Sequence, residues 1–150
     1  MQLTQHTDFG LRLLIVLARR GGEPIALPAF ASEQGLSYNH VAKVAQGLAR
    51  AGFVTTLRGR NGGVALARPA AEMTVGEVVR ALEPGMRLAD CAGCALRFDC
   101  ATSGYLGEAL AAFMAVLDRT SLADAAREVP TAFTLPSPGA GLGERGATAP

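Results

Sequence analysis

The sequence predicts a mainly α-helical fold with one small β-hairpin. Hydrophobic residues recur at helical spacing through most of the chain, and the spacing changes to two residues in one stretch rich in β-branched side chains. The chain has 150 residues, of which 49% are hydrophobic, and this is enough to build one domain with a buried core. Short segments rich in glycine or polar residues separate the predicted elements.

The first three predicted helices form a helix-turn-helix. Residues 4–20 carry apolar side chains on one face, and the glycines at 21–22 end this helix. A short second helix is expected over residues 28–35, with proline in its first turn and glycine at its end. Ser37 is a suitable N-cap for a third helix, over residues 37–51. A short helix, a glycine-containing turn and a capped helix are the pattern of a DNA-binding helix-turn-helix.

The third helix has one apolar and one cationic face. At 100° per residue its apolar side gathers Val41, Val44, Ala45 and Leu48. Its opposite side carries long polar side chains and no acid: Asn39, Lys43, Gln46 and Arg50. An ordinary solvated face is the alternative interpretation, but the helix-turn-helix context favours a recognition helix.

A basic β-hairpin follows the third helix. Residues 53–58 and 64–68 are predicted strands, and the segment between them is Gly59-Arg60-Asn61-Gly62-Gly63. Glycine and asparagine accept the positive φ of a tight turn. A nucleotide-binding P-loop is disfavoured because its GK[ST] ending is absent. Three helices and a basic hairpin make a winged helix-turn-helix domain, which we place at residues 1–84.

The charge distribution agrees with DNA binding by the first half. Residues 1–80 carry nine basic and five acidic side chains, whereas residues 81–150 carry five basic and eight acidic ones. Thirteen of the fourteen cations are arginine, which pairs bidentately with phosphate and guanine. We expect the third helix in the major groove and the wing at the backbone or minor groove of double-stranded DNA. The residues expected at the DNA are Ser37, Tyr38, Asn39, His40, Lys43, Gln46, Arg50, Arg58, Arg60 and Asn61.

The second half predicts a loop, a long helix and a tail. Thr74 and Glu77 form a capping box that begins a helix ending before the loop at residues 85–101. Residues 102–129 are expected to form a long dimerisation helix and a short C-terminal helix. The long helix has more apolar surface than a small domain easily covers, because of Leu106, Leu110, Phe113 and Leu117. Packing against its own domain is the alternative. Residues 130–150 are rich in glycine and proline, which predicts a disordered tail.

Several classes of protein are excluded by the sequence. No apolar run is long enough to span a membrane, and the first residues lack the basic region of a signal peptide. We therefore expect a cytoplasmic protein, in which thiols stay reduced. No nucleophile–base or acid–base pair is recognisable, so we do not expect an enzyme.

Three cysteines lie within ten residues, in the pattern C-x2-C-x5-C from Cys91 through Cys94 to Cys100. A structural zinc site requires a fourth nitrogen or sulfur ligand, and none is nearby. A thiol oxidoreductase requires a βαβ context that is absent, and a polar loop is a poor place for core cysteines. An iron–sulfur cluster held by three thiolates and one other ligand is favoured over these alternatives.

The chain resembles the bacterial iron–sulfur winged-helix regulators that include IscR, RirA and NsrR, and it is most similar to the nitric-oxide-sensing NsrR branch. The resemblance covers about residues 1–128. It depends on Leu3-Thr4, Thr7-Asp8, Asn39-His40-Val41, Lys43-Val44, Arg58-Gly59-Arg60-Asn61-Gly62-Gly63, Gly76-Glu77-Val78-Val79-Arg80, Leu82-Glu83-Pro84, Asp90-Cys91, Cys94, Cys100, Ala112-Phe113 and Leu117-Asp118-Arg119.

The resemblance implies the ligands of the cluster. The three thiolates would come from Cys91, Cys94 and Cys100, and the fourth ligand would be Asp8 of the partner subunit. An IscR-like histidine after the third cysteine is absent, and the gap between the first two cysteines is short for such loops. Asp90 and Asp99 are rival oxygen ligands, and an i, i+4 pair with Arg12 is the ordinary role for Asp8.

The function implied is a homodimeric transcriptional repressor that senses nitric oxide through an iron–sulfur cluster and releases its operator on cluster nitrosylation. A [4Fe–4S] cluster is expected rather than [2Fe–2S]. A two-fold dimer predicts a pseudo-palindromic operator with half-sites about one helical turn apart. One alternative is a regulator of the same family that responds to iron or cluster status. A metal-free thiol-redox regulator using Cys91 and Cys94 is the more distant one.

Overall fold

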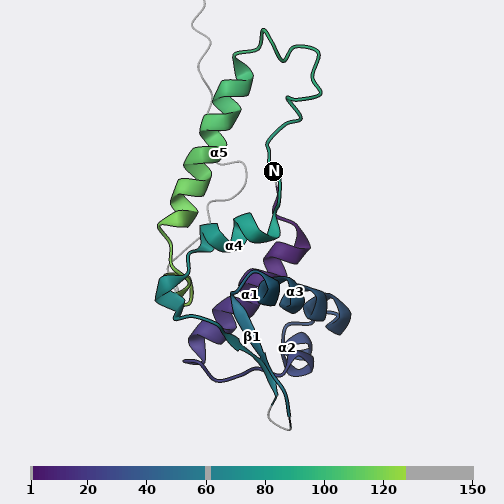
Figure 1. The fold of residues 1–150 in the computed structure, drawn as a ribbon, viewed down its shortest axis with the longest axis vertical. Coiled ribbons are helices and arrows are strands. Elements are labelled where there is room, and N and C mark those ends of the chain that lie inside the picture. Colours follow the sequence, from purple (N-terminus) through teal and green to yellow (C-terminus); the bar gives the residue numbers. More distant parts are fainter. Residues whose placement is uncertain (1, 60–61, 128–150) are drawn as a thin grey trace, which may run out of the picture.

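The computed structural model describes residues 2–59 and 62–127. Figure 1 shows a mainly helical chain with one hairpin, as the sequence predicts. In chain order the elements are α1 (Gln5–Arg19), α2 (Leu27–Glu33), α3 (Tyr38–Arg50), β1 (Val54–Leu57), β2 (Gly63–Leu66), the 3-10 helix η1 (Ala70–Glu72), α4 (Val75–Leu82), α5 (Thr102–Asp118) and α6 (Leu122–Ala125).

Two details differ from the sequence prediction. The short helix expected to run to residue 129 ends at Ala125, and after it the N–H of Arg127 bonds to the carbonyl of Asp124, three residues back instead of the four of an α-helix. The turn η1 was not expected, and it begins directly after Pro69, whose fixed φ favours a tight turn. The predicted disordered tail at residues 130–150 lies outside the described residues.

Helices α1, α2 and α3 form the helix-turn-helix body around one hydrophobic core. Thr4 caps α1, because its hydroxyl accepts a hydrogen bond from the N–H of Thr7 at 3.3 Å. The core contains side chains from all three helices, the hairpin and α4, and its fully buried members include Leu13, Leu14, Leu17, Phe30, Val41, Val44, Leu48, Val64, Met73 and Val78. Burial of this apolar stripe holds α3 with its polar face outward.

The hairpin is a two-stranded antiparallel sheet in which Val54 pairs with Leu66 and Leu57 with Gly63. It is anchored on the helical body by Ile25, whose N–H and C=O exchange hydrogen bonds of 2.9 Å with Val64. Glycine is required at position 63, because a Cβ atom there would overlap the backbone of Ile25. The base of the hairpin is therefore held against the helical body.

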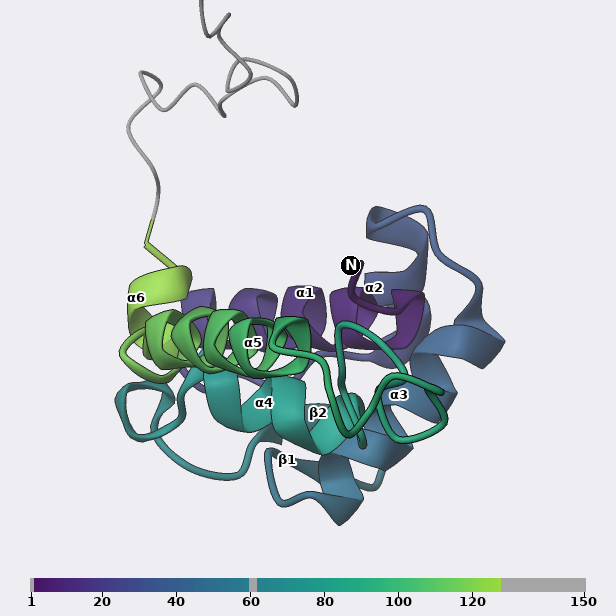
Figure 2. The ribbon, with the colours of Figure 1, turned by 90° about the horizontal axis from the view of Figure 1, so that it is seen from above.

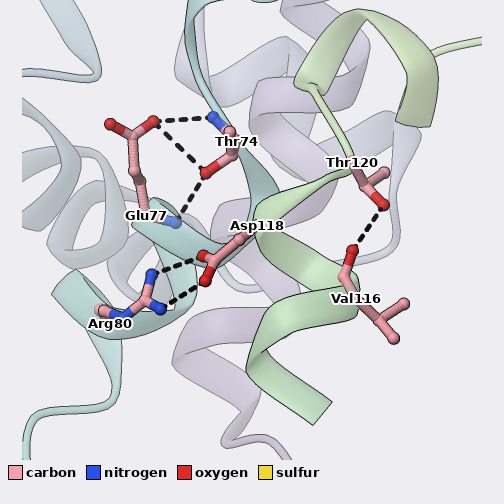
Figure 3. Close-up of polar contacts among 6 residues, drawn as sticks. All are labelled: Thr74, Glu77, Arg80, Val116, Asp118 and Thr120. Carbon is pink, nitrogen blue, oxygen red and sulfur yellow. Dashed lines mark hydrogen bonds and ion pairs between the residues drawn. The ribbon is translucent and has the colours of Figure 1, made fainter. Parts of the chain in front are cut away.

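Helix α4 begins with the predicted capping box. The N–H of Glu77 donates to the Thr74 hydroxyl at 3.1 Å, and the Thr74 N–H donates to the Glu77 carboxylate at 2.7 Å. Figure 3 shows this box beside the joint between α4 and α5. There Arg80 makes two hydrogen bonds of 2.6 Å to the carboxylate of Asp118. The N–H of Val75 donates to the carbonyl of Thr120 at 2.9 Å, so the C-terminal end of α5 is firmly attached.

The long helix predicted after the cysteine loop is confirmed as α5. It begins after the loop of residues 85–101, far from the winged body, and runs back toward that body (Figure 1). It lies over α4 when viewed from above (Figure 2). None of its seventeen residues is buried, and Tyr105 and Val116 are 70% and 52% exposed. No helix among the described residues is long and apolar enough to cross a membrane.

Candidate nucleic-acid interface and cysteine loop

The cationic face of α3 lies on the outside of the molecule. Val41, Val44, Ala45 and Leu48 are buried, whereas the polar residues of the opposite face are exposed: Asn39, Lys43, Gln46 and Arg50. Because α1 and α2 hold the apolar face, the whole polar face stays available to a ligand. The structure therefore brings these four sequence-predicted residues onto one surface.

The N-terminal end of α3 is also exposed, at Ser37, Tyr38 and His40. Ser37 occupies the N-cap position, as predicted, but its side chain makes no capping hydrogen bond. Its hydroxyl is thus not used by the helix. Tyr38, at 52% exposure, is one of the few large aromatic side chains that the body leaves at its surface.

The wing is the hairpin of β1 and β2, which follows α3 in the chain. Arg58 is exposed at the end of the first strand, and Gly59 after it has a φ of +108°, which favours glycine. The expected DNA contacts Arg60 and Asn61 lie outside the described residues.

The cysteine loop leaves α4 at Glu83 and returns to the start of α5. Its three thiols are free, with Cys94 exposed and the other two half-buried. The segment is a series of turns, in which the N–H of Cys94 donates to the carbonyl of Cys91 at 3.3 Å and the N–H of Leu96 approaches the sulfur of Cys94 at 3.4 Å. Leu96 and Phe98 are exposed at 65% and 87%, so the loop has no core of its own.

Cys100 lies immediately before α5, and this position affects its acidity. Hydrogen bonds from the N–H of Ser103 and from the hydroxyl and N–H of Thr102 lower the pKa of the Cys100 thiol. The thiolate is the form of cysteine that binds metals. The start of α5 therefore favours the ionisation state that a ligand needs.

In this single chain Asp8 has the ordinary role of a first-turn helix acid. Its carboxylate forms an ion pair with Arg12, at 2.7 Å between Oδ2 and Nη2, and both side chains are about half exposed. In the described part of the chain no three His, Cys, Asp or Glu side chains converge on a metal-sized site. The structure therefore does not bring Asp8 together with the three thiols.

The donor set still fits an iron–sulfur cluster by its chemistry. Three free thiols lie within ten residues, and none of them is committed to a disulfide. The turns around Cys91 and Cys94 are short and contain no buried residue, so they present no core packing that convergence would disrupt. Cys91, Cys94 and Cys100 could then supply three thiolates, and the fourth ligand would come from elsewhere.

Sequence reasoning missed a polar connection between α1 and the end of α4. The N–H and hydroxyl of Thr4 donate to Glu83 Oε1 at 2.7 and 2.8 Å. Partial burial opposes ionisation of Glu83, but hydrogen bonds from Thr4 and Thr7 and the nearby His6 lower its pKa overall. The partners are 79 residues apart, so no local signal in the sequence could have predicted them.

A second feature that sequence reasoning missed is the position of His6 against α3. The isolated Gly47 inside an otherwise helical pattern was the available signal, because such a glycine often marks a close approach. A Cβ atom at Gly47 would lie 3.3 Å from His6 Nε2. The first turn of α1 thus rests directly on the recognition helix.

The fold and the exposed cationic helix define the class of protein, which is a winged-helix transcriptional regulator rather than an enzyme. The particular family follows from its sequence: over residues 3–128 the chain matches the Rrf2 family, described as iron-dependent transcriptional regulators. The chain therefore belongs to the Rrf2 family.

Solved structures similar to this chain include regulators of two kinds. The oxidized form of CymR from Staphylococcus aureus is 30% identical, with a TM-score of 0.71, and the match covers 87% of this chain and 100% of that one. CymR of B. subtilis, named as its global cysteine regulator, is 27% identical with a TM-score of 0.72, covering 84% and 96% of the two chains. IscR of T. potens is 27% identical with a TM-score of 0.69, covering 83% and 85%.

Proposed function

We propose that this protein is a homodimeric, DNA-binding repressor whose affinity for its operator depends on an iron–sulfur cluster that responds to nitric oxide. The observation that carries the proposal is the C-x2-C-x5-C loop between a winged helix-turn-helix and a long exposed helix, in a family described as iron-dependent. As a DNA-binding regulator it would act in the cytoplasm.

DNA recognition would use the exposed face of α3 and the wing. Lys43 and Arg50 supply positive charge along the helix, and Asn39 and Gln46 supply amide groups that can pair with base edges. Arg58 would contact the sugar–phosphate backbone beside them. These roles are supported by the exposure of all five side chains.

Dimerisation would use α5. A helix of seventeen residues with no buried side chain and with exposed Tyr105 and Val116 requires a partner to cover its apolar surface. A second copy of the same helix is the partner expected from two-fold symmetry, and it would place two α3 helices on a pseudo-palindromic operator.

Cys91, Cys94 and Cys100 would hold the cluster together with Asp8 of the partner subunit, and [4Fe–4S] is favoured over [2Fe–2S]. When bound, the cluster supplies iron that can take a diatomic ligand. A carboxylate is a harder donor to that iron than a thiolate and leaves its position more exchangeable. Release of Arg12 from its present pair with Asp8 would make the carboxylate available.

Two alternatives share this architecture. A regulator of iron or cluster status would use the same ligands but a different signal. A metal-free thiol-redox regulator would use Cys91 and Cys94, and the similarity to CymR, solved in an oxidized form, favours this alternative over other metal-free ones.

The test is anaerobic purification followed by absorbance spectroscopy and by iron and sulfide counts. The proposal expects a coloured protein, and Cys→Ala at any of the three positions should abolish the stable cluster while the body stays folded. Asp90→Ala and Asp99→Ala test the two rival oxygen ligands and should keep the cluster, and loss of the cluster in either variant would make that carboxylate the ligand instead of Asp8. A colourless wild-type protein with bound zinc, or without metal, contradicts the proposal.

Nitric oxide distinguishes the remaining alternatives. In the wild type a few equivalents per cluster should bleach the absorption and release DNA in parallel. Asp8→Cys should slow both changes, because a thiolate binds iron more strongly than a carboxylate. If chelation of iron releases DNA and nitric oxide does not, the iron-status alternative is correct. If Asp8→Ala and Asp8→Cys behave as the wild type, Asp8 is not a ligand.

A further inference from the structure

A small cavity lies between the first turns of α1 and the N-terminal half of the recognition helix. Its volume is about 210 Å³, and its lining residues are Gln5, His6, Phe9, His40 and Lys43. Four of these five side chains carry N–H groups that can donate hydrogen bonds, and no acid lines the cavity. This composition suits an anion with several acceptor oxygens.

The two helices contribute to the cavity at fixed positions. His40 and Lys43 are three residues apart, so they lie one above the other on the same edge of α3. His6 reaches that edge because Gly47 has no side chain to keep it away. Phe9 is partly buried against the core and provides an apolar wall. The donors of α1 and α3 therefore converge without any large movement.

The location of the cavity identifies the anion. Lys43 belongs both to the cavity and to the exposed cationic face of α3, so a ligand in the cavity would lie beside any DNA that this face contacts. The anion that accompanies a recognition helix in the major groove is a phosphate of the DNA backbone.

We propose that this cavity binds one backbone phosphate of DNA, held jointly by α1 and the recognition helix. The proposal rests on the proposed DNA-binding function and adds Gln5 and His6, which lie outside the helix-turn-helix proper, to the interface. The position of the α1 donors is fixed by the hydrogen bonds of Thr4 to Glu83. The phosphate would thus be bound by a preorganised site rather than by long flexible side chains.

The experiment starts from the full-length wild type, which is first used to select a binding sequence from random duplexes. Fluorescence anisotropy then compares His6→Ala with the wild type on the selected duplex and on an unselected one. Loss of a phosphate contact should weaken both complexes alike, by roughly fivefold, because phosphates carry no sequence information. His6→Gln, which keeps an N–H donor, should recover most of the affinity.

Arg87→Ala is the matched control, because this exposed cation lies outside the cavity and its removal should leave affinity unchanged. A scan of the selected duplex with neutral methylphosphonates should find one phosphate whose neutralisation weakens the wild type but not His6→Ala. Circular dichroism of each variant checks that α1 still folds.

The outcomes separate the two proposals. If the wild type binds neither duplex, the DNA-binding function and the phosphate site both fall. If the wild type binds and His6→Ala binds equally well, only the phosphate site is overturned. If inorganic phosphate shifts the imidazole resonances of His6 and His40 while DNA affinity does not depend on His6, the cavity takes a free phosphate, and its assignment to the DNA backbone is wrong.

Discussion

The winged body and the arm formed by the cysteine loop and α5 differ in how they are stabilised. The buried hydrophobic side chains of the described residues lie between Leu13 and Leu82, with Leu122 added from α6. From residue 83 to residue 121 no side chain is buried. The body is thus held by its own core, whereas the arm is held at its ends by polar contacts.

This difference indicates how the apolar surface of each region is covered. A core residue gains its free energy within the chain, because its apolar surface is covered by neighbours in the same fold. Leu96, Phe98 and Tyr105 keep most of their surface exposed, so their burial would require a partner subunit or a bound group. A partner or a group bound at the arm would therefore leave the core of the body intact.

The largest expected effect comes from a core truncation in the body. Leu48→Ala should destabilise the fold by about 3 kcal/mol, because Leu48 is fully buried and a cavity would remain. Val116→Ala in the arm should cost less than about 0.5 kcal/mol of chain stability and act on dimer dissociation instead. Urea unfolding and sedimentation measure the two effects. An equal loss of unfolding free energy in the two variants would contradict the difference between body and arm.

A substitution at the joint between α4 and α5 should destabilise the protein nearly as much as Leu48→Ala. A Cβ atom at Gly76 would overlap the carboxylate of Asp118, so Gly76→Ala should destabilise the attachment of α5 by roughly 1–3 kcal/mol. Gly107→Ala is the matched control, because nothing lies within 4 Å of a Cβ atom there and alanine favours a helix. Thermal unfolding should show a loss for the first variant and none for the second.

The attachment of α5 through the Arg80–Asp118 pair should depend on pH. The hydrogen bonds from Arg80 lower the pKa of Asp118 below its ordinary 3.8, so the pair is fully formed above that pH and is lost as the pH falls through the lowered value. Asp118→Asn should remove this dependence. Amide exchange in the last turn of α5 measures it, and exchange that speeds up with acid equally in both proteins would contradict the expectation.

The smallest effect should come from Glu83, where the arm leaves the body. The net lowering of its pKa means that its hydrogen bonds to Thr4 stabilise α1 above pH 4.5 and are lost as the pH falls below that value. Solvent access limits the effect of Glu83→Gln to less than about 1 kcal/mol at neutral pH. The measurement is amide exchange at the first turn of α1. Unchanged exchange in Glu83→Gln would show that Thr4 and Thr7 hold this turn without Glu83.

The sequence predicted the elements of the body because their signals are local. Apolar spacing predicted α1 and α3 to within two residues, and the pair Thr74 and Glu77 predicted the start of α4. Apolar spacing also predicted α5 as a long helix after the cysteine loop. The cationic face of α3 followed from the same periodicity, since burying Val41 and Leu48 turns Lys43 outward.

Two kinds of feature could not be predicted from the sequence. One is contacts between residues far apart in the chain, and the other is groups that lie outside the chain. Arg80 and Asp118 are 38 residues apart, and neither carries a local sign of its partner. The three cysteines were recognised by their spacing, but their role as cluster ligands stays a prediction, because in the described residues no metal-sized group of side chains forms. Asp8 pairs with Arg12 in one chain, and the ligand role implied by the resemblance involves a second chain that a single sequence does not describe.

In the described residues, the hydrogen bonds that join α5 and the residues just after it to the body all lie at its C-terminal end, which gives the helix the geometry of a lever. Seventeen residues rising about 1.5 Å each span about 26 Å from the Arg80–Asp118 joint to the cysteine loop. A tilt of about 10° at the joint therefore moves the far end by about 4–5 Å, more than the 3.4 Å rise of one base pair. In a dimer joined through α5, a rotation at this joint would also move each winged body, and with it α3, relative to the partner.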